Sequence, residues 1–241
     1  AEVNHFHAAG GMGLLIRELL KQGLLHEDVT TIMGKGLKGY LVEPKLNSEG
    51  ALAWNEAAAS THDDTVLRSC NNPFQATGGL NVLEGPLGHA VIKTSSIPED
   101  RHVIEAPARV FHSQEELHAA FKAGELHRDV VAVVRFQGPK ANGMPELHRM
   151  TPPLSVLQDK GFRVGLVTDG RMSGASGKVP AAIHVTPAAA NGGAVARIRH
   201  ADFIRIDAIA GPLAVLVYGT DFGGCPPRTA RRSKNVSGHG S

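Results

Sequence analysis

The segment Arg163-Val-Gly-Leu-Val-Thr-Asp-Gly-Arg-Met-Ser-Gly-Ala-Ser-Gly-Lys-Val-Pro180 decides the fold expected of this chain. Its first residues form an apolar run typical of a buried strand, and a loop of glycines, hydroxyls and charges follows directly. The glycines let the backbone approach a ligand closely, and their N–H groups can gather on an anion. Arg171 and Lys178 would add positive charge. The segment therefore predicts a strand that delivers a ligand-binding loop.

A hydroxyl in such a loop can have its alkoxide stabilised, which is what Ser173 would need to act as a base. The alternative is an ordinary polar turn between two strands. The segment is not a Walker A loop, because Met172 stands where a glycine is required and Val179 where Ser or Thr is required.

Strands are frequent on both sides of this segment. We predict them over residues 90–94, 103–111, 130–136, 163–167, 181–185, 195–198, 203–206 and 213–217, the last three as a meander. Two helices interrupt them: Ser113 opens a capping box for residues 114–122, and Thr151 is predicted to cap a helix that ends before Gly161.

A leading piece over residues 1–75 lacks this strand pattern. It carries an amphipathic helix over residues 12–22 and a short helix expected within 51–59. The chain therefore divides near residue 75 into a mostly helical piece and a β-rich α/β domain over residues 76–220. Residues 221–241 are expected to form a disordered basic tail.

Composition excludes several classes of protein. The 241 residues are 42% hydrophobic and 20% charged, which indicates a folded core. No apolar run approaches the roughly 20 residues that span a bilayer, so no membrane partner is expected. The net charge of +2 depends on four bases in residues 225–241; without them 21 Lys and Arg face 23 Asp and Glu. That distribution argues against nucleic-acid binding. Two cysteines exclude a disulfide-rich scaffold.

Three other positions are chemical candidates. Glu146 follows a Gly/Pro loop at a strand end and suits a Mg²⁺ site completed by substrate oxygens, although it is otherwise a solvated carboxylate. His5 and His7 could face one way as metal ligands, or the glycines after them could bind an anion, or the segment is ordinary packing. Cys70 has no base or second thiol near it in sequence and is interpreted as structural.

Read together, several segments resemble the dihydroxy-acid and phosphogluconate dehydratase family. They are Asn4-His-Phe-His-Ala-Ala-Gly-Gly11, Gly78-Gly-Leu80, Ala90-Val-Ile-Lys-Thr94, Asn142-Gly-Met-Pro-Glu-Leu147 and Val167-Thr-Asp-Gly-Arg-Met-Ser-Gly174. The likeness runs in order over about residues 1–217, and the segments beginning at Arg135 and at Ser173 are most similar to the 6-phosphogluconate type. After about Val217 the chain departs from the family pattern, and residues 225–241 are interpreted as an out-of-frame or foreign end.

The resemblance implies a fold and an activity. The fold would be a β-rich swivelling α/β domain, a β/β/α sandwich or barrel-like unit similar to the last domain of aconitase, preceded by the helical end of an α/β N-terminal domain. The activity would be the loss of water from 6-phospho-D-gluconate, giving 2-dehydro-3-deoxy-6-phosphogluconate in the Entner–Doudoroff pathway. The partner is then a small sugar-acid phosphate, and the parent enzyme a cytoplasmic homodimer.

The resemblance also implies roles for residues. Ser173 would be the alkoxide base and Glu146 a Mg²⁺ ligand, while Arg171, Ser176, Lys178, His5 and His7 would bind substrate. An iron–sulfur cluster would act as Lewis acid, with no ligand from either cysteine of this chain. The chain alone is therefore expected to be an inactive fragment. The alternatives are a branched-chain or sugar-acid dehydratase, or a swivelling domain that binds a ligand without chemistry.

Overall fold

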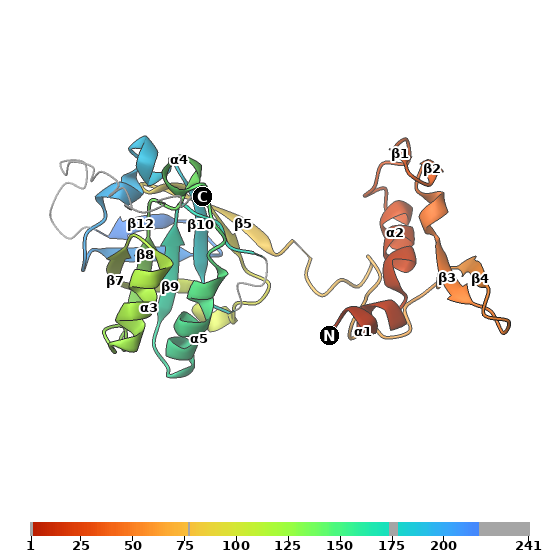
Figure 1. Ribbon diagram of the computed structural model, residues 1–241, viewed down its shortest axis with the longest axis horizontal. Coiled ribbons are helices and arrows are strands. Elements are labelled where there is room, and N and C mark those ends of the chain that lie inside the picture. Colours follow the sequence, from red (N-terminus) through yellow and green to blue (C-terminus); the bar gives the residue numbers. More distant parts are fainter. Residues whose placement is uncertain (1, 77, 174–177, 217–241) are drawn as a thin grey trace, which may run out of the picture. The chain divides into compact units, whose positions relative to one another are not determined.

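The computed structural model describes residues 2–76, 78–173 and 178–216. The chain divides into two compact units, residues 1–77 and residues 78–241 (Figure 1). In the described residues no helix is both long and apolar enough to cross a bilayer. The functional division at this boundary, a cluster-bearing domain followed by a swivelling domain, stays a prediction, and the predicted tail lies outside the described residues.

The first unit is built from two helices and two hairpins. Helix α1 (Val3–Ala8) leads into α2 (Gly11–Lys21), and the hairpins pair β1 (Thr30–Thr31) with β2 (Gly34–Lys35) and β3 (Val42–Leu46) with β4 (Leu52–Glu56). A one-turn 3₁₀ helix, η1 (Lys38–Tyr40), lies between the hairpins. Helix α2 agrees with the predicted amphipathic helix to within one residue at each end.

The helix predicted within residues 51–59 is wrong, because that segment is strand β4. The cause is the turn before it, where the Asn47 side chain accepts hydrogen bonds from the backbone N–H groups of Glu49 (3.0 Å) and Ala51 (2.9 Å). Gly50 completes the turn with a φ of 76°, a conformation that glycine adopts without strain. The reversal brings β4 back along β3 in antiparallel register.

The described residues of the second unit form one eight-stranded sheet of order β12-β11-β7-β8-β9-β10-β6-β5. Its strands are β5 (Leu80–Gly85), β6 (Gly88–Lys93), β7 (Val103–Phe111), β8 (Val130–Val134), β9 (Val164–Thr168), β10 (Ala181–Thr186), β11 (Phe203–Asp207) and β12 (Leu213–Leu216). Strands β7 to β10 run parallel, and the two strands on each flank are antiparallel.

The sheet curls until its two edges nearly meet. The Glu84 N–H in β5 donates to the carbonyl of Gly211 (2.8 Å), and Glu84 forms a parallel bridge with Pro212 just before β12. At Gly85 the approach is so close that an added Cβ would lie 2.4 Å from the Leu213 carbonyl oxygen. The predicted α/β fold with a barrel-like, β-rich domain is therefore confirmed.

Strand alternation gives this sheet two separate cores. Along β8, Val131 and Val133 belong to the core inside the curled sheet, which also contains Ile104 of β7 and Ile206 of β11. The intervening residues of β8 face outward into a second core. That outer core is covered by α3 (Gln114–Lys122) and α5 (Thr151–Asp159), which lie on the same side of the sheet (Figure 1).

The ends of helices α3 and α5 agree with the caps predicted from the sequence, except at Thr151. Ser113 Oγ accepts from the Glu116 N–H (3.1 Å), as predicted, while the Glu116 carboxylate reaches back to the N–H of His112 (2.7 Å). Thr151 does not cap α5 but is its first residue, because the 3₁₀ turn η3 (His148–Met150) runs straight into the helix and makes Met150 the N-cap. Gly161 ends the helix with a φ of 95°.

Two strand predictions also need correction. Residues 195–198 are not a strand: the turn η5 (Ala194–Arg197) occupies this stretch, so the predicted meander reduces to β11 paired with β12. Strand β5 is an addition to the predicted strands, and it pairs with β6 across the tight turn Pro86-Leu87. The described part of this unit also contains three short turns, η2 (Glu99–Arg101), α4 (Pro139–Asn142) and η4 (Ala189–Asn191).

Replacing Gly85 by alanine should open the contact between β5 and β12. The added methyl group would clash with a backbone carbonyl that cannot move without disturbing the sheet edge, so we expect the free energy of unfolding to fall by about 1–3 kcal/mol. Gly78→Ala is the matched control, because a methyl group at that position would point into open space, with nothing within 4 Å. Urea unfolding of both variants measures the change in the free energy of unfolding. Equal changes would contradict a close contact between β5 and the segment at β12.

Asp207, at the end of β11, should make stability depend on pH. Burial on its own would raise the pKa of this carboxyl, but hydrogen bonds from the Ala210 N–H (2.8 Å), Arg205 Nη2 (2.8 Å) and the Ile209 N–H (3.1 Å) outweigh it and hold the pKa below its usual value. A lowered pKa in the folded state stabilises the fold above the unfolded pKa of about 3.9, and this contribution is lost as pH falls through the folded pKa.

The variant Asp207→Asn removes that titration. The difference in unfolding free energy between the original chain and the variant should therefore be largest near neutral pH and shrink as pH falls below about 4. Urea unfolding at several pH values between about 2 and 7 gives the difference directly. A difference that stays constant over this range would show that the carboxylate charge does not contribute.

Candidate active site

Polar residues gather where two neighbouring parallel strands end. Strand β8 is followed by Arg135 and Gln137, and β9 ends at Thr168 and is followed by Asp169; all four are buried. Ligands of open α/β sheets bind outside the carboxyl ends of the strands, because loops from neighbouring strands converge there. This edge of the sheet is therefore the candidate location of the active site.

Asp169 ties three segments of this edge together. Its Oδ1 accepts the Gln137 N–H (2.9 Å), and its Oδ2 accepts the N–H groups of Phe136 (3.2 Å) and Ala189 (2.9 Å). The residue is only 2% exposed, so these three backbone N–H groups take the place of water around the carboxylate. No separate role was predicted for Asp169 from the loop sequence, although its position directly after a buried strand was the available signal.

The backbone on either side of Asp169 is equally constrained. The Thr168 hydroxyl accepts the Gly170 N–H (3.0 Å), and the Gly170 carbonyl accepts the His184 N–H (2.9 Å). A Cβ at Gly170 would lie 2.5 Å from Leu147 Cδ1 and 2.8 Å from Gln137 Cβ, so only glycine fits between these side chains. The loop therefore leaves β9 in one fixed direction, toward Glu146.

Glu146 is the point at which the two predicted site segments meet. Its Oε2 accepts from Arg171 Nη1 (2.8 Å), and its Oε1 accepts the N–H groups of Ser173 (2.8 Å) and His148 (3.1 Å). The backbones are also joined, because the Leu147 N–H donates to the Arg171 carbonyl (3.2 Å). The structure thus brings Glu146, Arg171 and Ser173 together, and Ser173 is exposed.

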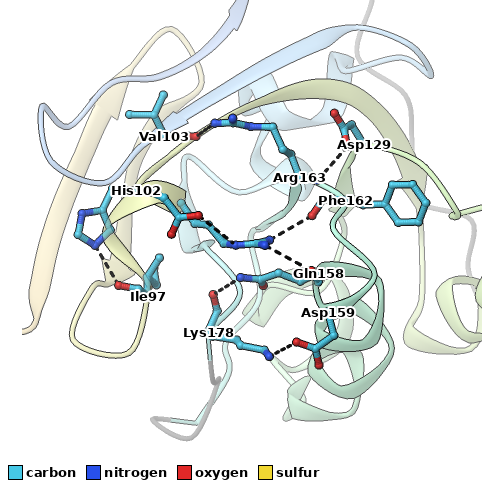
Figure 2. A network of polar contacts seen from close by, with 11 residues as sticks. Ile97, His102, Val103, Asp129, Gln158, Asp159, Phe162, Arg163 and Lys178 are labelled. Carbon is cyan, nitrogen blue, oxygen red and sulfur yellow. Dashed lines mark hydrogen bonds and ion pairs between the residues drawn. The ribbon is translucent and has the colours of Figure 1, made fainter.

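Lys178 is not part of the cluster formed by Glu146, Arg171 and Ser173. Figure 2 shows its ammonium group on the carboxylate of Asp159, at the end of α5, while its carbonyl accepts a hydrogen bond from Gln158 Nε2 (3.1 Å). Asp159 precedes the start of β9, whereas Ser173 follows the end of that strand. Lys178 as a substrate ligand stays a prediction that requires release from Asp159. Ser176 lies outside the described residues.

His5 and His7 belong to the first unit, so their assignment to this site stays a prediction. His5 Nδ1 accepts the N–H of Glu2 (3.0 Å). His7 lines a polar hollow of about 300 Å³ together with Glu43, His62 and other residues of the first unit.

The described residues fit the two implied cofactors differently. Mg²⁺ commonly takes one or two protein carboxylates and completes its shell with substrate oxygens and water, so Glu146 suits a single place in such a shell. A cation there would compete with Arg171 for the carboxylate. Within residues 2–76, 78–173 and 178–216, no three His, Cys, Asp or Glu side chains form a metal-ligand group, and Cys70 is the one free cysteine. These residues do not supply an iron–sulfur ligand set.

The fold and this site define an α/β domain whose charged loops converge at the carboxyl ends of parallel strands. Two family descriptions match the sequence: "Dihydroxy-acid/6-phosphogluconate dehydratase C-terminal" over residues 65–236 and "Dihydroxy-acid/6-phosphogluconate dehydratase N-terminal" over residues 1–40. The chain therefore belongs to the dihydroxy-acid/6-phosphogluconate dehydratase family. Because the match reaches residue 236, the expectation that the likeness ends near Val217 is wrong.

Individual members of the family differ in how similar they are to this chain. The chain is 59% identical over 217 residues to the phosphogluconate dehydratase of Rhizobium meliloti, which covers 90% of this chain and 36% of that protein. It is 54% identical over 240 residues to the phosphogluconate dehydratase of Escherichia coli, covering 100% and 40%. The dihydroxy-acid dehydratase of Sulfurisphaera tokodaii is 39% identical over 212 residues, covering 87% and 35%. The chain thus spans less than half the length of these relatives.

Asp169→Asn should loosen this edge of the sheet. An amide of the same shape keeps one acceptor oxygen but turns an N–H₂ donor toward a backbone N–H, so at least one charge-assisted bond is lost and the free energy of unfolding should fall by about 1.5–3 kcal/mol. Asp129→Asn is the control, because that exposed carboxylate accepts one backbone N–H, from Arg163 (2.8 Å). Chemical denaturation measures the free energy of unfolding of both variants. If Asp169→Asn lowers it no more than Asp129→Asn does, Asp169 does not organise this edge of the sheet.

Proposed function

We propose that this chain is part of a hydro-lyase that converts 6-phospho-D-gluconate into 2-dehydro-3-deoxy-6-phosphogluconate, a step of the Entner–Doudoroff pathway. Identities of 59% and 54% to two phosphogluconate dehydratases, against 39% to a dihydroxy-acid dehydratase, support this substrate over the branched-chain alternative. Since the relatives are more than twice as long as the matched segment, the activity proposed is that of a longer protein.

The observation that carries the proposal is the shared carboxylate of Glu146. It holds the Ser173 N–H at 2.8 Å and Arg171 Nη1 at 2.8 Å, and therefore places an exposed hydroxyl residue, a carboxylate and a guanidinium in one cluster. A base, a carboxylate for a cation and a positive charge for a substrate anion are the groups that dehydration of a hydroxy acid requires.

The reaction removes the C2 proton and the C3 hydroxyl of the sugar acid. In our proposal Ser173 Oγ, as alkoxide, accepts the C2 proton, and the electron pair of the C2–H bond becomes the C2–C3 double bond as the C3–O bond breaks. The departing hydroxide takes up the proton that Ser173 accepted and leaves as water, which returns Ser173 to the alkoxide, and the resulting enol rearranges to the 2-oxo acid. Arg171 would hold a substrate anion beside Ser173 and favour the alkoxide by its charge.

A Mg²⁺ ion on Glu146 would polarise the substrate carboxylate and make the C2 proton more acidic. Departure of hydroxide calls for a second Lewis acid, which by family resemblance is an iron–sulfur cluster held outside the described residues. We further propose, on the same resemblance, that Ser176, Lys178, His5 and His7 contact substrate and that the parent enzyme is a cytoplasmic homodimer.

Ser173→Ala should abolish turnover without weakening substrate binding. The test uses a hybrid enzyme in which this chain replaces the segment it matches in the Escherichia coli relative. Loss of a general base that acts only in the transition state predicts a fall in kcat of about 10²–10⁴-fold, with KM and the visible spectrum of the cluster little changed.

Ser155→Ala is the matched control, because this serine lies on α5, outside the cluster around Glu146. It should leave kcat within about twofold of the unmodified hybrid. A Ser173→Ala enzyme that keeps more than about a tenth of the rate, a barrier change under roughly 1.4 kcal/mol, would exclude Ser173 as the base.

A further inference from the structure

Strained backbone gathers at the candidate active site. Among the described residues, four that are not glycine have a positive φ: Phe136 (61°), Met144 (56°), His184 (56°) and Ala201 (71°). The Phe136 N–H donates to Asp169 (3.2 Å). The Met144 carbonyl accepts from Arg171 Nε (3.0 Å). Strain of this kind clusters at functional sites, and at His184 the side chain has no role in the site as described so far.

His184 lies in a β-bulge of strand β10. The register with β6 shifts between Ile183 and Thr186, because residues 183 to 186 of β10 span residues 91 to 89 of β6, so β10 has one residue in excess. The Thr186 hydroxyl donates to the His184 carbonyl (3.1 Å) inside the bulge. His184 adopts the left-handed conformation that glycine usually takes at the first residue of such a bulge, so its β-carbon adds strain that glycine would avoid.

The bulge decides which side chain of β10 enters the core. Ala182 belongs to the core inside the curled sheet, and regular alternation would place His184 there as well. The extra residue gives that place to Val185, which is buried, and leaves His184 exposed. Its imidazole forms no hydrogen bond or ion pair with another described residue. The strained bulge therefore presents a histidine side chain that the fold does not use.

The bulge lies beside the loop that follows β9. Strand β9 has β8 as its neighbour on one side and β10 on the other (Figure 1). On the β10 side, the His184 N–H donates to the Gly170 carbonyl (2.9 Å). On the β8 side, the Leu147 N–H donates to the Arg171 carbonyl (3.2 Å). The loop that carries the proposed base is therefore bordered by the segment of Leu147 on one side and by His184 on the other.

The imidazole has the hydrogen-bonding capacity of a partner for a hydroxyl group. A neutral imidazole carries one N–H donor and one nitrogen acceptor, and a hydroxyl group likewise donates one hydrogen bond and accepts others. A sugar acid presents several hydroxyl groups along its chain. A histidine beside the loop of Arg171 and Ser173 can therefore bind a substrate hydroxyl without adding charge to the site.

We propose that His184 is a further substrate-binding residue of this site and that its imidazole binds a hydroxyl group of the sugar acid. The proposal rests on the proposed function for the class of substrate. It explains why histidine occupies a backbone position that suits glycine better, because glycine would lack the imidazole. Loss of this side chain should therefore weaken substrate binding without weakening the fold.

The first measurement is urea unfolding of the 241-residue chain. His184→Gly should leave the unfolding midpoint unchanged or raise it, because glycine relieves the left-handed strain and the exposed imidazole makes no contact that is lost. Ala201→Gly is the matched control, since this exposed residue before β11 has the same backbone conformation, and its midpoint should move in the same direction. A clearly lower midpoint for His184→Gly would assign the imidazole to the fold and overturn the proposal.

The second measurement uses the hybrid enzyme with 6-phosphogluconate. His184→Gly should raise KM about tenfold, through the loss of a hydrogen bond made in both the ground state and the transition state, and should change kcat by less than about threefold. His184→Asn should raise KM less, because asparagine tolerates the left-handed backbone and also carries a donor and an acceptor. Ala201→Gly should leave KM within about twofold of the unmodified hybrid.

The outcomes separate this proposal from the proposed function. A KM for His184→Gly within about twofold of the unmodified hybrid, or equal increases in His184→Gly and Ala201→Gly, would overturn the role of His184 and leave the proposed function intact. An unmodified hybrid that dehydrates no phosphogluconate would contradict the proposed function. Titration calorimetry with 6-phosphogluconate then replaces KM, and weaker binding by His184→Gly alone would still support the contact, whereas equal binding would overturn it.

Discussion

The carboxylate of Asp169, accepting three backbone N–H groups, is the interaction on which the working edge of this domain depends. It joins the end of β8, the end of β9 and the turn after β10 at one buried point. With these backbones fixed, the loop after β9 reaches Glu146 in a single arrangement. An ionic acceptor suits this role because its bonds to N–H groups are stronger than those of a neutral acceptor in a dry interior.

Negative and positive side chains lie at different places along this edge of the sheet. Glu146 places negative charge beside Arg171 and Ser173, whereas Arg135 and Arg199 place positive charge beyond β7 and β8. Charge is therefore unevenly distributed along this edge of the sheet.

Much of this could be predicted from local sequence. The apolar runs of β8 and β9, the Ser113 cap and the loop from Asp169 to Ser173 are signals contained within a few residues. The errors arose where a distant or neighbouring segment decides the outcome. Residues 51–59 form β4 because the Asn47 turn returns them along β3. The carbonyls of residues 196 and 198 accept from Arg135, which is distant in sequence, in place of a strand partner. The contacts of Asp169 likewise depend on tertiary structure.

The near-closure of the sheet has a consequence for synthesis of the protein. Strand β5 opens the second unit and β12 lies at its far end, yet Glu84 bonds to Gly211 across the seam. The last edge of the sheet can form only after the ribosome has released residues beyond Gly211, so the unit must stay partly open during most of its translation. Contacts so distant in sequence slow folding and leave strand edges exposed to chaperones and to other nascent chains.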